Sequence, residues 1–141
     1  MPSSANEKEK GKDDCAARVF VVFKDQLPRA SAYSRLKHKL GTTFSSFVPP
    51  GVAICYVWSN KLAKEESLES PFTDWVRIVA VESGTEKKDQ WVSEQRNVFE
   101  DFKRLFGAEP EKIVGVAVMT DTDQTGESIT SFYREISFTR K

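Results

Sequence analysis

The chain has 141 residues, of which 39% are hydrophobic, and its 21 Lys+Arg are balanced by 21 Asp+Glu. This length suits one domain with a real core and is too short for two. The balanced charge excludes a global field that would draw in nucleic acid or an anionic membrane. No apolar stretch approaches the ~20 residues of a membrane helix, so we expect neither a nucleic-acid partner nor a membrane span.

Residues 1–12 are polar and highly charged, and they lack the apolar middle region of a signal peptide. A segment of this composition buries too little apolar surface to pack. We therefore expect a disordered charged tail over residues 1–12 and a single domain over residues 13–141. Two cysteines, Cys15 and Cys55, are compatible with either redox compartment.

Four segments are predicted as strands because they are short, apolar and rich in β-branched and aromatic residues. They cover residues 17–23, 52–58, 75–81 and 113–119. The first is expected to be central in its sheet. The last is a continuous apolar run, which predicts a strand covered on both faces. Trp75 and Tyr56 lie in such strands and are expected in the core.

The helix over residues 98–106 has clear end markers. Asn97 can cap its N-terminus with Glu100 as capping-box partner, and Gly107 closes it. A weaker apolar stripe predicts a first helix over residues 31–40.

Two further segments give weaker strand patterns. Residues 90–94 alternate only loosely and suggest a short edge strand, whereas residues 132–138 place Phe132, Ile136 and Phe138 on one face. Five or six strands with one sure helix fit either a sandwich or a mixed α/β layer. The scarcity of crossover helices favours the mainly β alternative.

An acidic loop follows the apolar run that ends at Met119. Asp121, Asp123 and Thr125 offer oxygens at alternate positions, as in the first half of an EF-hand calcium loop. The glutamate due later in such a loop is replaced by Phe132, so the motif is half a site. Asp14, or its neighbour Asp13, can complete it if both loops lie at the same end of the fold. Three interpretations stay open: these aspartates cap a turn, they bind a structural cation such as calcium, or they bind another ligand.

Trp58 and Trp91 are the candidate ligand-binding residues, because sugar rings stack on exposed aromatic side chains and both tryptophans have polar neighbours. Enzymatic chemistry has few candidates. His38 is the single histidine, and no Gly-x-Ser-x-Gly elbow is present. What remains is acid chemistry by paired carboxylates drawn from the acidic loop and Asp14.

Several blocks together resemble one known family. They are DDCAARVFVVF at residues 13–23, YVWSN at 56–60, WVSEQRNV at 91–98, GVAVMTDTDQTGES at 115–128 and YREISF at 133–138. In their order and spacing these blocks resemble the domain of unknown function 3047 family. The resemblance implies a jelly-roll-like β-sandwich, of the type found in carbohydrate-binding modules, with no established activity. It also implies a periplasmic or secreted precursor.

Members of the family resembled carry further strands ahead of the block equivalent to Asp13 and Asp14, so we expect this chain to be a truncated member. Missing strands would leave an unpaired sheet edge and favour self-association. The functional expectation is a non-enzymatic β-sandwich module that binds a glycan and holds calcium at Asp14, Asp121 and Asp123. The alternatives are a carboxylate-dependent glycan-active enzyme and a truncated product without independent function.

Overall fold

The computed structural model describes residues 4–24 and 51–140. The helix predicted over residues 31–40 lies outside the described residues. No helix among the described residues is long and apolar enough to cross a membrane.

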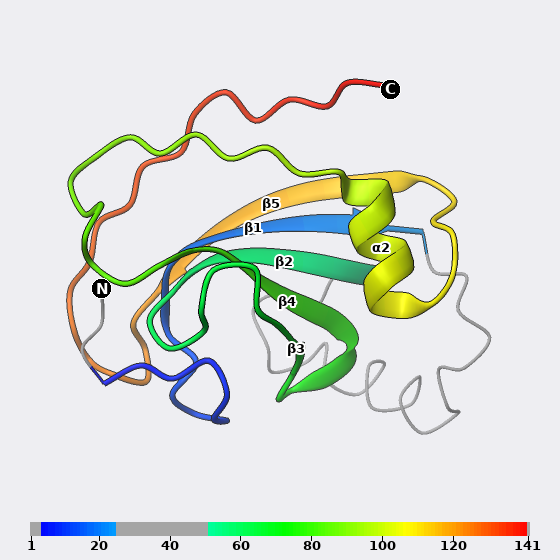
Figure 1. Cartoon of the computed structure of the whole chain (residues 1–141). Coiled ribbons are helices and arrows are strands. Elements are labelled where there is room, and N and C mark those ends of the chain that lie inside the picture. The colour runs from blue at the N-terminus through cyan, green and yellow to red at the C-terminus, as the bar shows by residue number, and fades with distance from the viewer. Residues whose placement is uncertain (1–3, 25–50, 141) are drawn as a thin grey trace.

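A five-stranded mixed sheet is the centre of the fold (Figure 1). In sheet order the strands are β3 (Ser67–Ser70), β4 (Thr73–Ser83), β2 (Val52–Ser59), β1 (Cys15–Phe23) and β5 (Ile113–Asp121). β1 runs antiparallel to β2 and β5, β4 runs parallel to β2, and β3 runs antiparallel to β4. The mainly β class and all four strongly apolar strands are thus confirmed. β3 was not predicted, because its sequence Ser-Leu-Glu-Ser is short and polar.

The sheet has an apolar layer on each face. On one face Val21, Phe23 and Ile54 pack under the helix α2 (Val98–Phe106), whose Phe102 ring lies 4.6 Å from the Phe23 ring. On the other face Phe20, Val22, Cys55, Val57 and Leu62 form a second cluster. Trp75 and Tyr56 are buried, as predicted. The described residues form one sheet, so the sandwich itself stays a prediction.

Two predicted strands are wrong. Residues 90–94 and 132–138 are irregular in the structure. Asp89, with a φ of 62°, turns the chain just before the first segment, and Glu135, with a φ of 56°, interrupts the second. A residue with positive φ breaks the extended backbone that a strand needs.

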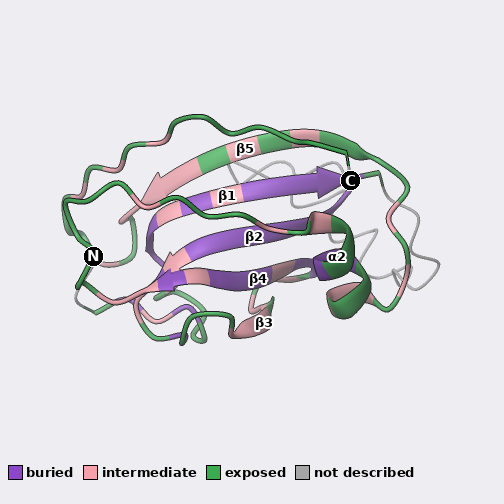
Figure 2. Ribbon diagram, turned by 45° about the horizontal axis from the view of Figure 1, so that its top comes forward, coloured by how far each residue is buried: buried purple, intermediate pink, exposed green. Residues whose placement is uncertain are grey.

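A third expectation, that the apolar run of β5 is covered on both faces, is wrong. This strand lies at the edge of the sheet, and Figure 2 shows it exposed or half-buried where β1, β2 and β4 are buried. Val114, Val116 and Val118 are 47%, 41% and 48% exposed. An apolar run predicts a strand, but it does not report how many neighbours the strand has or how much of its faces is covered.

Residues 4–12, predicted as a disordered tail, form turns that lie against the loop after β2. Glu7 is buried, and its carboxylate accepts hydrogen bonds from the backbone N–H groups of Asn60 at 2.6 Å and Lys61 at 3.2 Å. One buried, hydrogen-bonded carboxylate thus attaches a segment that is otherwise polar.

The ends of α2 form as predicted. The Asn97 side chain accepts a hydrogen bond from the Glu100 N–H at 3.3 Å. Gly107 adopts a φ of 68° and its N–H donates to the Lys103 carbonyl. A left-handed residue at this position is the usual end of a helix and favours glycine.

Asp101 fixes α2 to the sheet through polar contacts. Its carboxylate accepts from the Tyr56 hydroxyl at 2.9 Å, from Arg96 at 2.8 and 3.0 Å, and from Arg104 at 3.1 Å. Burial acts to raise the pKa of Asp101, but the bonds from Arg96, Arg104 and Tyr56 outweigh it, so its pKa lies below the ordinary value. Burial beside Asp101 raises the pKa of Tyr56. Neutralising Asp101 should therefore loosen the helix.

We predict that Asp101→Asn lowers the free energy of unfolding by about 2–3 kcal/mol, because it leaves partly buried Arg96 and Tyr56 groups without their charged partner. Urea unfolding measures this change. The matched control is Glu100→Gln, an exposed neighbour on the same helix, which should change stability by less than about 0.5 kcal/mol.

The difference in stability between wild type and Asp101→Asn should depend on pH, with a sign that follows from the lowered pKa of Asp101. Because the folded-state pKa of Asp101 is lowered, its contribution is present above its unfolded pKa, about 4, and is lost as pH falls through the folded pKa. The stability gap between wild type and Asp101→Asn should narrow below about pH 4. A gap that stays constant on acidification would contradict this assignment.

Candidate acidic binding site

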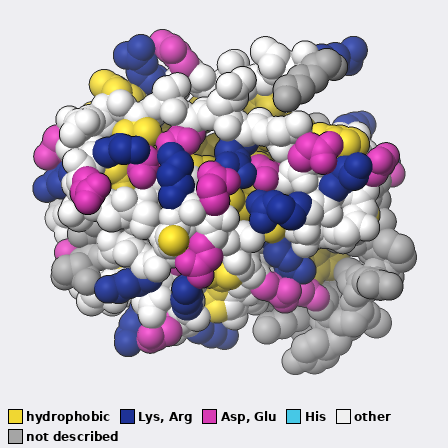
Figure 3. Space-filling view, in the orientation of Figure 1, with side chains coloured by type: hydrophobic (Ala, Val, Ile, Leu, Met, Phe, Trp, Pro, Cys, Tyr) yellow, Lys and Arg dark blue, Asp and Glu magenta, His cyan; other side chains and the backbone are white. Residues whose placement is uncertain are grey.

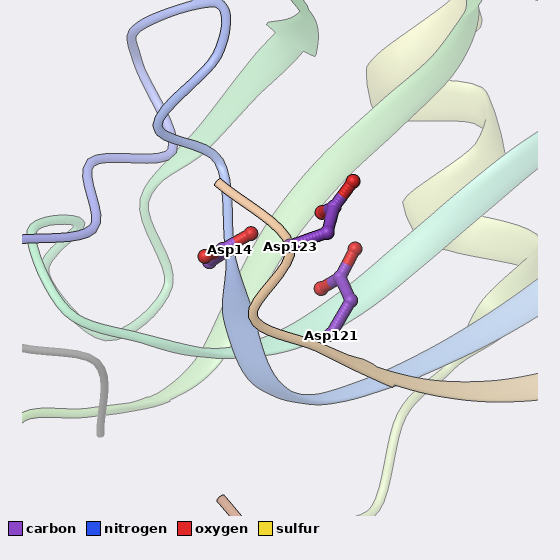
Figure 4. A group of neighbouring side chains, drawn as sticks. All are labelled: Asp14, Asp121 and Asp123. Atoms are coloured by element: carbon purple, nitrogen blue, oxygen red, sulfur yellow. The ribbon is translucent and has the colours of Figure 1, made fainter. Parts of the chain in front are cut away.

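Four carboxylates gather where β1 begins and β5 ends. Asp13 and Asp14 precede β1, Asp121 ends β5 opposite Cys15, and Asp123 follows in the loop. We call these four residues the acidic corner. Ligand atoms of Asp14, Asp121 and Asp123 all lie within 4.8 Å of one another (Figure 4). The structure thus brings together the three residues that the sequence singled out for a metal.

Asp14 caps the loop that follows β5. It is fully buried, and its two oxygens accept from the N–H groups of Gln124 at 3.3 Å and Thr125 at 2.6 Å. Gly126, with a φ of 66°, closes the turn by donating its N–H to the Thr122 carbonyl. Burial acts to raise the pKa of Asp14, but its hydrogen bonds to Thr125 and Gln124 outweigh burial and lower it. Turn capping is real here, and the residue that performs it is Asp14 from the other end of the chain.

Arg18 supplies the positive charge of the acidic corner. It is 9% exposed, and its guanidinium lies 3.0 Å from an Asp121 oxygen and 3.7 Å from an Asp13 oxygen. It also donates to the Asp13 carbonyl oxygen. Among the described residues, neither Asp14 nor Asp123 has an ion-pair partner. Arg18 therefore pairs with two of the four carboxylates of the acidic corner.

The pKa values within the acidic corner diverge. Burial raises the pKa of Asp121 above its ordinary value despite the opposing charge of Arg18, and Asp14 and Asp123 add to the rise. Burial likewise raises the pKa of Asp13. One oxygen of Asp13, Oδ1, is buried without a hydrogen-bond partner among the described residues. The four carboxylates of the acidic corner carry more negative charge than the single guanidinium of Arg18 neutralises.

Tyr133 joins the C-terminal segment to this end of the sheet. Its hydroxyl accepts from the Arg18 N–H at 3.2 Å, donates to the Met119 carbonyl at 2.7 Å and lies 2.9 Å from Thr120 Oγ1. The β1–β5 register shifts between Cys15 and Arg18, which separates the backbone groups that Tyr133 bridges. Sequence reasoning missed this role, because a β-bulge leaves no residue pattern in this chain.

The two predicted ligand-binding tryptophans differ in environment. Trp91 is 63% exposed, its ring centre lies 6.5 Å from that of Phe132 at a tilt of 58°, and the Arg134 guanidinium lies 5.2 Å from the Trp91 ring centre. Trp58 is half-buried, and its indole N–H donates to the Gly84 carbonyl at 2.8 Å. Trp58 is paired with Ala17, so it lies at the same end of the sheet as the acidic corner.

The potential nucleophiles are poorly placed for catalysis. Cys15 and Cys55 are free and buried, and burial raises the pKa of Cys15 to about 11 and that of Cys55 further. A thiol with such a pKa stays protonated near neutral pH. His38 lies outside the described residues.

On the face shown in Figure 3, Lys and Arg side chains are interspersed with Asp and Glu side chains. A mixed five-stranded sheet with a helix on one face and the acidic corner at one end defines a mainly β domain. The chain belongs to the family described as protein of unknown function (DUF3047), whose model matches residues 1–137. The family resemblance of the sequence blocks is thereby confirmed. No curated protein and no solved structure matches the chain significantly.

We predict that Tyr133→Phe destabilises the protein by about 1–2 kcal/mol, because the Arg18 N–H and the Met119 carbonyl lose their shared partner. Hydrogen exchange of residues 128–140 should also become faster. The neighbouring change Phe132→Leu affects a 75% exposed ring and should do neither. Equal effects of the two substitutions would contradict the bridging role of the hydroxyl.

Proposed function

We propose that this domain is a non-enzymatic binding module that holds a divalent cation, calcium, at Asp14, Asp121 and Asp123 and binds a glycan beside it. The observation that carries the cation is the approach of three carboxylates within 4.8 Å with a single guanidinium nearby. Like charges at this distance repel each other, and a bound cation would relieve that repulsion.

Calcium fits the donor set better than other common metals. The cluster supplies only oxygen ligands, which hard cations prefer, and neither histidine nor thiolate takes part. Oxygens on opposite sides of a bound calcium lie about 5 Å apart, since each Ca–O distance is about 2.4 Å. The remaining positions would be filled by water and by carbonyl groups of the loop, as is common for calcium.

Arg18 and the cation would share the acidic corner. Arg18 pairs with Asp121 and Asp13, whereas the cation is proposed to bridge Asp123, Asp14 and the second oxygen of Asp121. Asp14 already accepts two N–H groups, which leaves lone pairs on its carboxylate for a metal. A bound cation would thus fasten the loop after β5 to the start of β1.

The glycan proposal rests on Trp91. This side chain is largely exposed and contacts Phe132 and Arg134, and an exposed indole is a side chain on which a sugar ring can stack. Phe132 adjoins Tyr133, whose hydroxyl contacts Thr120 beside Asp121. The aromatic cluster therefore adjoins the acidic corner along the chain. Trp58 supports this end of the sheet through its bond to Gly84.

The alternative of a carboxylate-dependent glycan-active enzyme is less well supported. Glycosidases place their two carboxyl groups about 5–5.5 Å or 6.5–9.5 Å apart, on either side of the sugar. Asp14, Asp121 and Asp123 are closer than this, and Asp14 is fully buried with both oxygens bonded to the backbone. The raised pKa of Asp121 suits a proton donor, but Arg18 occupies the same carboxylate.

We predict that calcium raises the melting temperature of the wild-type chain relative to a chelator. When free calcium is about 100 times its Kd, the stabilisation is about 2.7 kcal/mol, roughly 5 °C or more for a domain of this size. Asp123→Asn should abolish the shift. In chelator this variant should melt no lower than wild type, because it relieves repulsion from Asp14 and Asp121.

Asp89→Asn is the matched control, because it makes the same chemical change on an exposed turn residue with a φ of 62°, a conformation that asparagine adopts readily. It should keep the full calcium shift. A wild-type melting temperature that does not respond to calcium would remove the cation from the proposal.

For the glycan, we predict that wild type binds members of a glycan array and that Trp91→Ala loses this binding with an unchanged melting temperature, because the ring is exposed. Phe72→Ala, which removes an exposed aromatic at the β3–β4 turn, should bind as wild type does. An array without any bound glycan would contradict the carbohydrate proposal and favour a product without independent function.

A further inference from the structure

The outer edge of β5 is the least protected part of the sheet. β5 pairs with β1 on one side, and its backbone makes no ladder with any described segment on the other. It spans nine residues, and residues 113–120 contain no charged side chain. The opposite edge, β3, has only four residues and carries Glu69 in an ion pair with Arg77. Proteins protect exposed edges by such shortness and charge, and β5 has neither.

The side chains of β5 add apolar surface to this open edge. Val116 and Val118 lie on one face of the strand, since Val116 is opposite Val21 and Val118 is opposite Val19, and Val114 lies where the β1–β5 register shifts between Val22 and Phe23. Each is between 41% and 48% exposed. Phe132 and Trp91, both largely exposed, are held near the end of β5 by the contact of Tyr133 with Thr120 and Met119.

We propose that the β5 edge pairs with β5 of a second copy of this chain, to form a continuous antiparallel sheet across a twofold axis. Such an axis, perpendicular to the sheet, places residues of the same strand face opposite one another. With Val116 opposite Val116 of the second copy, Val118 of each strand lies opposite the segment around Val114 of the other, so the exposed valines of the two strands meet. A shift by two residues in either direction places one valine against Thr120 or Lys112 instead.

A second copy suits this edge better than a charged partner. The chain has a net charge of zero, so there is no net electrostatic repulsion between two copies. Residues 113–120 carry no charged side chain with which a basic or acidic peptide could pair. Strand pairing alone buries less than the roughly 800 Å² per partner of a standard stable interface. The exposed side chains of Val114, Val116 and Val118, together with Phe132, add apolar area to the pairing. This inference does not rest on the proposed cation or glycan.

The test is the mass of the purified chain in solution, by size exclusion with light scattering over a range of concentrations. Wild type should approach twice the chain mass of 16.0 kDa at high concentration. Val116→Lys should be monomeric, because it places two like charges opposite each other. Phe72→Lys, an equally exposed apolar residue at the opposite edge, should dimerise as wild type does. Wild type that stays monomeric at all concentrations would overturn the proposal.

Two further experiments test the register and show that the variants still fold. Val116→Lys mixed with Val116→Glu should recover the dimer, since the new charges then attract across the axis. Val116→Cys should form a disulfide-linked dimer on oxidation, whereas Val118→Cys should form much less, because residue 118 lies away from the twofold axis. The native thiols are buried and should not interfere. Failure of the mixed charges to recover the dimer, or equal crosslinking at both positions, would overturn the register.

Discussion

The buried guanidinium of Arg18 is the constraint around which one end of this domain is organised. A charge in the middle of an apolar strand needs a partner, and breaking such a buried pair costs several kcal/mol. Asp121 and Asp13 provide the partners, one from the end of β5 and one from the residues before β1. The need to pair Arg18 therefore holds the start of β1 against the end of β5. Once they are joined, Asp14 is within reach of the loop after β5 and caps it.

The same arrangement accumulates more negative charge than Arg18 neutralises. Burial raises the pKa of Asp121 and Asp13, whereas backbone hydrogen bonds lower that of Asp14 despite its burial. Protons and a divalent cation are thus competing ways to relieve the repulsion within the acidic corner. The pairing with Arg18 accounts for Asp13 and Asp121, and the capped turn accounts for Asp14. Asp123 has neither role, and the proposed binding function rests on its approach to Asp14 and Asp121.

The sequence contains enough information to locate most of the fold but not its edges. Apolar runs identified β1, β2, β4 and β5, and Asn97 with Gly107 identified the ends of α2. The exposure of β5 could not be predicted, since an apolar run looks alike in an edge strand and a central one. The false strand over residues 132–138 fails at Glu135, whose positive φ has no marker in the sequence.

The candidate site was partly predictable. The spacing of Asp121 and Asp123 marked the loop, and the position of Asp14 before a strand made it a conditional third member. Arg18 and Tyr133 were not predicted as site residues, because their roles depend on the β1–β5 register and its bulge, which are tertiary features.

The most direct test of the account is a calorimetric titration of the wild-type chain with calcium at near-neutral pH. A cation site made by Asp14, Asp121 and Asp123 predicts one calcium bound per chain, with affinity that falls on acidification as Asp121, whose pKa is raised, takes up a proton. Asp123→Asn should give only the heat of dilution. Binding that is absent in wild type, or that persists unchanged in Asp123→Asn, would contradict the assignment of the acidic corner.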